Sequence, residues 1–170
     1  MSTKDAKDKY RELINSAAQN SVAGIGLGLL AGPLGKVHPA VGSGLAFAAQ
    51  GAGIMGDVDA YKAHNLQPNK PNSGASAWEQ NAYKMTDAKR KALYSIAGLI
   101  PLAGGAAAAA SANKGALAAG LGGGALGVGL YGIGKSLAGT YYAGKVLANK
   151  DSEVKKTASA LEKFVAINLR

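Results

Sequence analysis

The chain has 170 residues, 25 of them glycine, and a formal net charge of +9 at pH 7. Glycine and alanine together outnumber the large apolar residues, and alanine gains little free energy on burial. This composition excludes an ordinary globular enzyme. Cysteine is absent, which excludes disulfides and thiolate metal sites, and His38 and His64 are too few to form a zinc cage. We therefore expect no catalytic residue, no metal and no cofactor.

The positive charge lies mainly in two stretches without Asp or Glu. In residues 13–56 the only charged residue is Lys36. In residues 88–150 every charged residue is basic. Soluble helices usually mix both signs on their exposed faces. Acid-free stretches this long indicate contact with lipid or nucleic acid. The residues expected to face lipid or phosphate are Lys89, Arg90, Lys91, Lys135, Lys145 and Lys150.

Four uncharged runs within these stretches are long enough to cross a bilayer. They cover residues 13–35, 37–56, 92–113 and 115–134, and 20 residues of helix rise about 30 Å. Four crossings would leave both termini on one side of the membrane. The mean hydropathy of the chain is only +0.03, so we expect conditional insertion from a soluble or assembled store. A soluble helical protein with an Ala/Gly-rich core stays open as the alternative.

The first hairpin is expected in residues 1–65. Its first helix should run from about Thr3 toward Gly32, with a break bracketed by Pro33 and Pro39, and Pro39 should start the second helix. Small residues at four-residue spacing would let the two backbones approach closely. These expected helix-packing residues are Gly24, Gly28, Gly32, Ala48, Ala52 and Gly56.

A linker at residues 66–75 separates this hairpin from a second one at residues 76–149. Ser76 and Glu79 form a capping box that predicts a helix start, and Pro101 with Gly104-Gly105 should interrupt or kink that helix. The Asn113-Lys114-Gly115 sequence predicts the turn. The following helix should be weakened at Gly122-Gly123-Gly124, and its expected small-residue contacts are Gly120, Gly123, Gly124 and Gly127.

A separate amphipathic helix is expected over residues 150–170, capped by Asp151-Ser152. Its apolar stripe would consist of Val154, Ala158, Leu161, Val165 and Leu169. The predicted fold is therefore all-α: two Ala/Gly-rich helical hairpins, a polar linker and a C-terminal amphipathic helix.

One segment matches a nucleotide-binding pattern literally. Residues 129–136, GLYGIGKS, fit G-x-x-x-x-G-K-[ST], which needs a preceding buried strand and a downstream acid for magnesium. The preceding residues are Ala/Gly-rich and unlike a strand. We therefore interpret the match as a consequence of the glycine content.

Taken together, the glycine-rich hairpins, the basic bias and the absence of a signal-peptide pattern resemble the small internal virion proteins, or DNA-ejection proteins, of short-tailed bacteriophages. The resemblance covers roughly residues 13–149 in composition and layout. It implies a mostly helical protein that is stored in the virion and released into the host envelope, where it helps to form a channel for genome entry. The implied partners are the lipid bilayer, further copies of the chain, other virion proteins and, without sequence specificity, DNA.

Two other classes stay open at this point. One is a holin- or bacteriocin-like pore former made by a cell, although holins usually have more apolar spans and bacteriocins are generally shorter. The other is a soluble helical structural or scaffold protein of a virion, whose small-residue helices pack against a protein partner. None of the three classes is an enzyme.

Overall fold

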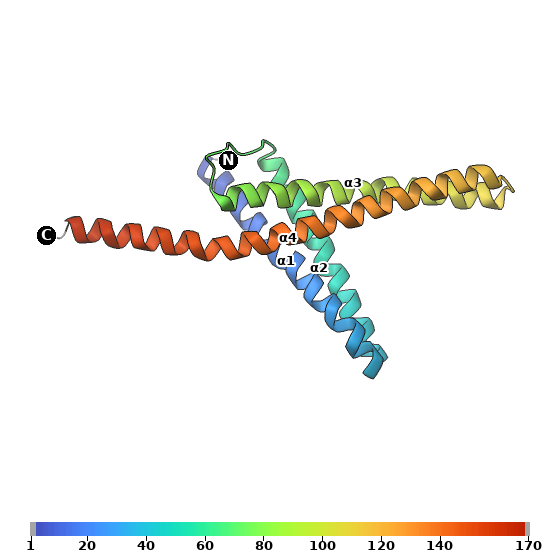
Figure 1. The fold of residues 1–170 in the computed structure, drawn as a ribbon, viewed down its shortest axis with the longest axis horizontal. Helices are drawn as coiled ribbons and strands as arrows, with labels where there is room; N and C mark the ends of the chain where they lie inside the picture. The colour runs from blue at the N-terminus through green and yellow to red at the C-terminus, as the bar shows by residue number, and fades with distance from the viewer. Residues whose placement is uncertain (1–2, 169–170) are drawn as a thin grey trace.

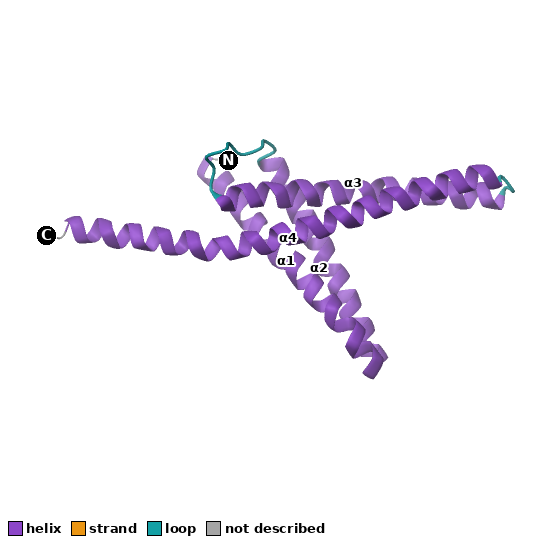
Figure 2. Ribbon diagram, viewed as in Figure 1, coloured by secondary structure: helices purple, strands orange, loops and turns teal. Residues whose placement is uncertain are grey.

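A computed structural model describes the backbone of residues 3–168 and the side chains of residues 4–149. Within that range the chain forms four helices and no strand: α1 (Thr3–Val37), α2 (Pro39–Leu66), α3 (Ala77–Ser111) and α4 (Gly115–Asn168). The prediction of an all-α protein is confirmed. Helices α1 and α2 lie side by side, as do α3 and α4, and the two pairs cross each other (Figure 1). Figure 2 shows a long loop that joins α2 to α3.

The core lies where the two helix pairs cross. It is built mainly from the first half of α1, the second half of α2, the start of α3 and the middle of α4. Tyr10 and Trp78 meet edge to face with ring centroids 6.3 Å apart, a favoured aromatic geometry. Small side chains surround them and allow the four backbones to approach closely. The core residues are Tyr10, Ile14, Ala17, Ala18, Ala60, Ala63, Trp78, Ala82, Met85, Ala143 and Val146.

The turn between α1 and α2 is shorter than predicted. We expected a break from Pro33 to Pro39, but α1 continues through Pro33 to Val37, and only His38 separates the two helices. A proline inside a helix removes one backbone hydrogen bond, and here the ring lies on an exposed part of α1. His38 N–H donates to Leu34 O at 2.8 Å and closes the helix. Pro39 starts α2, as predicted.

The second helix pair begins at the predicted capping box. Glu79 N–H donates to Ser76 Oγ at 3.2 Å, and Ser76 N–H donates to Glu79 Oε2 at 2.9 Å. The predicted turn is also present, with Asn113 in the left-handed region at a φ of 55°. The expected interruption at Pro101 is wrong, because α3 continues unbroken to Ser111. Nor does α4 break at its three consecutive glycines.

A separate C-terminal helix does not start at Asp151, because α4 runs without a break from Gly115 to Asn168. Asp and Ser favour the first position of a helix but do not stop a helix that is already formed. No Pro or Gly follows Lys145 to end it. The predicted apolar stripe of residues 154–169 lies outside the side chains that the structure describes.

Candidate functional site

Apolar side chains are exposed mainly on two arms, which are the parts of the helix pairs beyond the crossing. We define the N-terminal arm as residues 22–55 and the C-terminal arm as residues 92–134; the two diverge in Figure 1. Each arm contains one charged residue, Lys36 or Lys114. Large exposed apolar patches on a soluble protein mark sites that bind a partner or a membrane. The more exposed of these side chains include Leu29, Leu30, Phe47, Ile54, Met55, Ile100, Leu126, Leu130 and Ile133.

Two of the described helices are long and apolar enough to cross a membrane. They are α3 over Ala77–Ser111 and α4 over Gly115–Asn149, and few residues of their apolar windows are buried within the protein. Helices α1 and α2 do not meet this condition among the described residues. Among the described residues, the expectation of four crossings is therefore reduced to one candidate hairpin, formed by α3 and α4.

Between α1 and α2, the closest approach of the backbones lies at only some of the expected glycines. A Cβ at Gly24 would lie 3.0 Å from Ala49 O, and a Cβ at Gly56 would lie 3.1 Å from Ala17 O. Near the turn, Gly42 packs directly on Gly35, where a Cβ would come within 2.7 Å of the Gly35 nitrogen.

The remaining expected residues of the first pair lie farther from the partner helix. A Cβ at Gly28 would be 3.8 Å from Ala49 Cβ, and one at Gly32 would meet nothing within 4 Å. Ala52 is half-buried and Ala48 is exposed. The contact face of α2 is therefore rotated by about one residue from the expected one, toward Ala49.

In the second pair, α4 approaches α3 most closely at glycines other than those expected, and of the expected ones Gly124 is in contact with α3. A Cβ at Gly132 would lie 2.9 Å from Ser95 Cβ, and one at Gly139 would lie 2.8 Å from Lys89 Cδ. Gly124 is near Leu102 at 3.8 Å, whereas Gly120, Gly123 and Gly127 have nothing within 4 Å. The three glycines without a contact lie on the exposed surface of the arm. Leucines of α3 pack against the opposite side of α4.

Lys89 is not on the surface where we expected it. Its side chain is 2% exposed, and Nζ lies 2.7 Å from Asp57 Oδ1 of α2. This oxygen has no hydrogen-bond partner apart from the ion contact. The pair therefore joins the two helix pairs inside the protein. The sequence shows an acid on α2, Asp57, that has no basic residue one helical turn away, and this could have indicated an ion pair with another helix. The sequence does not show which lysine forms that pair.

The other expected basic residues that the structure describes are at least partly exposed. Arg90 and Lys91 contact Asp87 at 3.2 Å and 2.6 Å, with side chains 30% and 41% exposed. The ammonium groups of Lys135 and Lys145 lie over tyrosine rings, 5.2 Å and 4.6 Å from the centroids. The side chain of Lys150 lies outside the described residues.

A buried histidine lies at the contact between α2 and α3. His64 is 2% exposed, and Nδ1 lies 3.3 Å from Thr86 Oγ1. Burial lowers the pKa of His64, and the nearby positive charge of Arg90 acts in the same direction. Burial also raises the pKa of Tyr10 to about 12, with a smaller contribution from Glu79. Burial therefore disfavours the charged form of both side chains.

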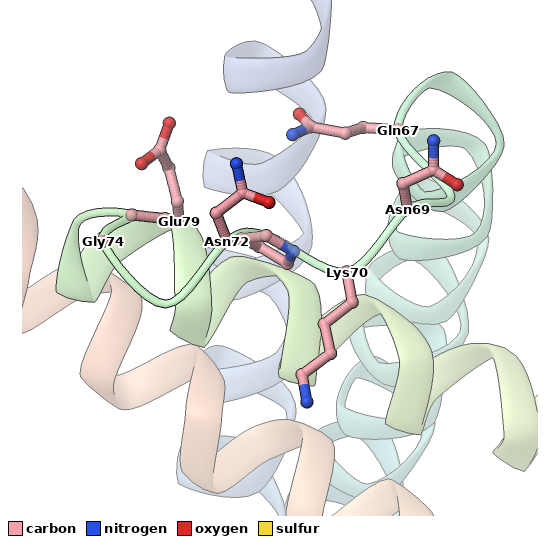
Figure 3. A pocket seen from close by; sticks show the side chains of 8 residues that line it. Gln67, Asn69, Lys70, Asn72, Gly74 and Glu79 are labelled. Carbon is pink, nitrogen blue, oxygen red and sulfur yellow. The ribbon is translucent and has the colours of Figure 1, made fainter.

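Two cavities lie in the part of the chain that the structure describes. A cavity of about 290 Å³ lies at the base of the C-terminal arm, between Asp57, Ser95, Leu99 and Val128. A polar hollow of about 530 Å³ lies on the loop between α2 and α3, where Figure 3 shows Gln67, Lys70 and Glu79 spread apart rather than converging.

The described residues contain no group of three His, Asp or Glu side chains placed to hold a metal ion. Residues 129–136, which match the phosphate-binding pattern, lie inside α4. A phosphate-binding loop needs free backbone N–H groups at a helix start. The interior of a helix does not offer them.

Comparison with known proteins gives no relative. No protein family matches the chain, and neither a curated protein nor a solved structure matches it.

Proposed function

We propose that the protein is a membrane-inserting component of an oligomeric channel. The observation that carries this proposal is the combination of a charged, well-packed crossing region with a C-terminal arm that is long, apolar and exposed. An arm of two 20-residue helices matches the hydrocarbon thickness of a bilayer, about 30 Å. Insertion from one face would carry only Lys114 across the membrane.

Oligomerisation follows from the size of the arm. Two helices enclose no channel, so a pore requires several copies of the chain. The exposed small residues of the C-terminal arm, such as Gly120 and Gly127, have nothing within 4 Å. Helices in lipid associate through small residues of this kind. We therefore propose a homo-oligomer in which the C-terminal arms of neighbouring copies pack through these faces.

The biological setting that we propose is that of an internal virion protein of a short-tailed phage. Such a protein is stored in the virion interior beside other virion proteins and the genome, and it acts in the host envelope membrane. The weak hydropathy of the chain supports a stored state, because a permanently embedded protein gains more from larger apolar residues. A holin- or bacteriocin-like pore former is the alternative source of the same activity.

A second candidate is a soluble structural protein of a virion. The buried contacts between α2 and α3, Asp57 with Lys89 and His64 with Thr86, favour it, because they fix the angle between the arms. In that case the arms would pack against protein rather than lipid.

Dye release from liposomes separates the two candidates. We expect the purified protein to release dye, and we expect Leu126→Arg to abolish the release, because arginine at a bilayer centre costs about 3 kcal/mol on insertion scales. Leu126 is 71% exposed, so the substitution leaves the fold intact. Leu66→Arg, at an exposed residue outside the arms, is the matched control and should release dye normally. No release by the unmodified protein would favour the structural candidate.

A further inference from the structure

Basic residues on α3 and α4 meet at the base of the C-terminal arm. Lys91 is the last charge on α3 before the arm, and Lys135 is the first charge on α4 after it. The two helices are antiparallel, with Ser95 facing Gly132 and Lys89 facing Gly139. This register places Lys91 and Lys135 at the same height, where the uncharged arm begins.

Tyrosines accompany these charges at the same level. The Arg90 guanidinium lies 5.9 Å from the Tyr94 ring centroid, and the Lys135 ammonium lies 5.2 Å from that of Tyr131. The two rings are 57% and 51% exposed. Tyr131 on α4 is next to Gly132, which faces Ser95 of α3, one helical turn beyond Lys91. The helices therefore share one surface, the basic–aromatic collar, which consists of Arg90, Lys91, Tyr94, Tyr131 and Lys135.

We propose that the basic–aromatic collar binds the phosphates of anionic lipid headgroups and fixes the depth to which the C-terminal arm inserts. This inference rests on the proposed function, since it names the lipid that the inserting arm recognises. Exposed tyrosines suit the bilayer interface, where one end of the ring is apolar and the hydroxyl stays in water. The position of the charges favours lipid over nucleic acid, because they form one level directly below an apolar segment instead of following an extended groove.

Asp87 is the collar's own counterion. It contacts both Arg90 and Lys91 and leaves the three cations with a net charge of +2. A lipid phosphate can share these cations with the carboxylate. Neutralising Asp87 should therefore strengthen binding to anionic lipid, an effect that a purely structural role of this cluster would not produce.

Flotation with vesicles tests the proposal. The full-length protein should bind vesicles of phosphatidylcholine with phosphatidylglycerol much more tightly than vesicles of phosphatidylcholine alone. Each basic residue near an anionic surface strengthens binding about fivefold, so Arg90→Gln, Lys91→Gln and Lys135→Gln combined should weaken it by roughly 100-fold. Asp87→Asn should strengthen binding. The charge-matched control replaces three exposed lysines outside the collar by Gln: Lys7, Lys62 and Lys70.

The experiment distinguishes misfolding of a variant, failure of the collar proposal and failure of the proposed function. Circular dichroism checks the fold of each variant, and Lys91→Gln with Lys135→Gln serves if the triple variant does not fold. An equal loss of vesicle binding in the collar variant and in the lysine control would overturn the proposal. So would equal binding of the unmodified protein to anionic and neutral vesicles. Competition by inorganic phosphate beyond that of sulfate at equal ionic strength would overturn it in favour of a free-phosphate site. If the collar variant loses DNA binding while its vesicle binding is unchanged, the proposal is overturned in favour of nucleic acid. Normal binding without dye release would uphold the collar and contradict the proposed function instead.

Discussion

The Lys89 ammonium of α3 lies 2.7 Å from Asp57 Oδ1 of α2 and links the two helix pairs inside the protein. The aliphatic part of the same side chain passes under Gly139 of α4, where no Cβ would fit without a shift. One lysine therefore brings three helices together at the point where the arms separate.

Lys89→Met should destabilise the protein by about 3 kcal/mol, because it leaves Asp57 charged and unpaired in a nearly buried position. The double variant Asp57→Asn, Lys89→Met should recover most of that loss, since both charges are then gone. Denaturant unfolding followed by circular dichroism measures the free energies. A loss below about 1 kcal/mol in the single variant would contradict a buried, coupled pair.

The tip of the N-terminal arm offers a matched pair of glycine substitutions. Gly42→Ala should cost roughly 1–3 kcal/mol, because the new Cβ would meet the backbone of Gly35 and force the helices apart. Gly44→Ala has open space around it and should stabilise α2 by about 0.5–1 kcal/mol. Thermal unfolding of the two variants checks both signs. Equal effects would argue against direct contact between α1 and α2 at the turn.

Acidification should destabilise the protein through His64. Its pKa is lowered in the folded protein because burial disfavours the charged ring. Below about pH 6.5 the unfolded chain therefore binds a proton that the folded chain does not, and the free energy of unfolding decreases as the pH falls. Asp87 partly opposes this effect, whereas Arg90 and Lys91 reinforce it.

Unfolding measured between neutral pH and pH 5 tests this dependence. A His64→Gln variant should lose most of the decrease, while His38→Gln, at an exposed turn residue, should keep it. Identical slopes in all three proteins would show that His64 is not responsible.

The helices could be predicted from the sequence because their start signals are local. Pro39, the Ser76–Glu79 capping box and Asn113 each act on the backbone within one helical turn. The interruption predicted at Pro101 failed because packing along the whole of α3 outweighs the loss of one hydrogen bond. The helix propensity of the sequence around Pro101 does not include the contribution of that packing.

The tertiary contacts were less accessible to sequence reasoning. In a chain so rich in Gly and Ala, many helix faces carry equally small residues, so the pattern does not show that Gly132 and Gly139, rather than Gly120 or Gly127, meet α3. Lys89 illustrates the same limit, because its neighbours in sequence, Arg90 and Lys91, remain partly exposed while it is buried. Only the way in which the two helix pairs cross determines which of these three basic residues is buried.

Insertion of the C-terminal arm into lipid is the central claim, and a fluorescent probe tests it most directly. The chain contains no cysteine, so Leu126→Cys accepts a single environment-sensitive dye in the middle of the arm, and Lys62→Cys gives a control outside it. On addition of anionic vesicles we expect a blue shift and quenching by lipid-borne quenchers at residue 126, and neither at residue 62. A dye at residue 126 that stays in water while the protein is bound to vesicles would contradict the claim.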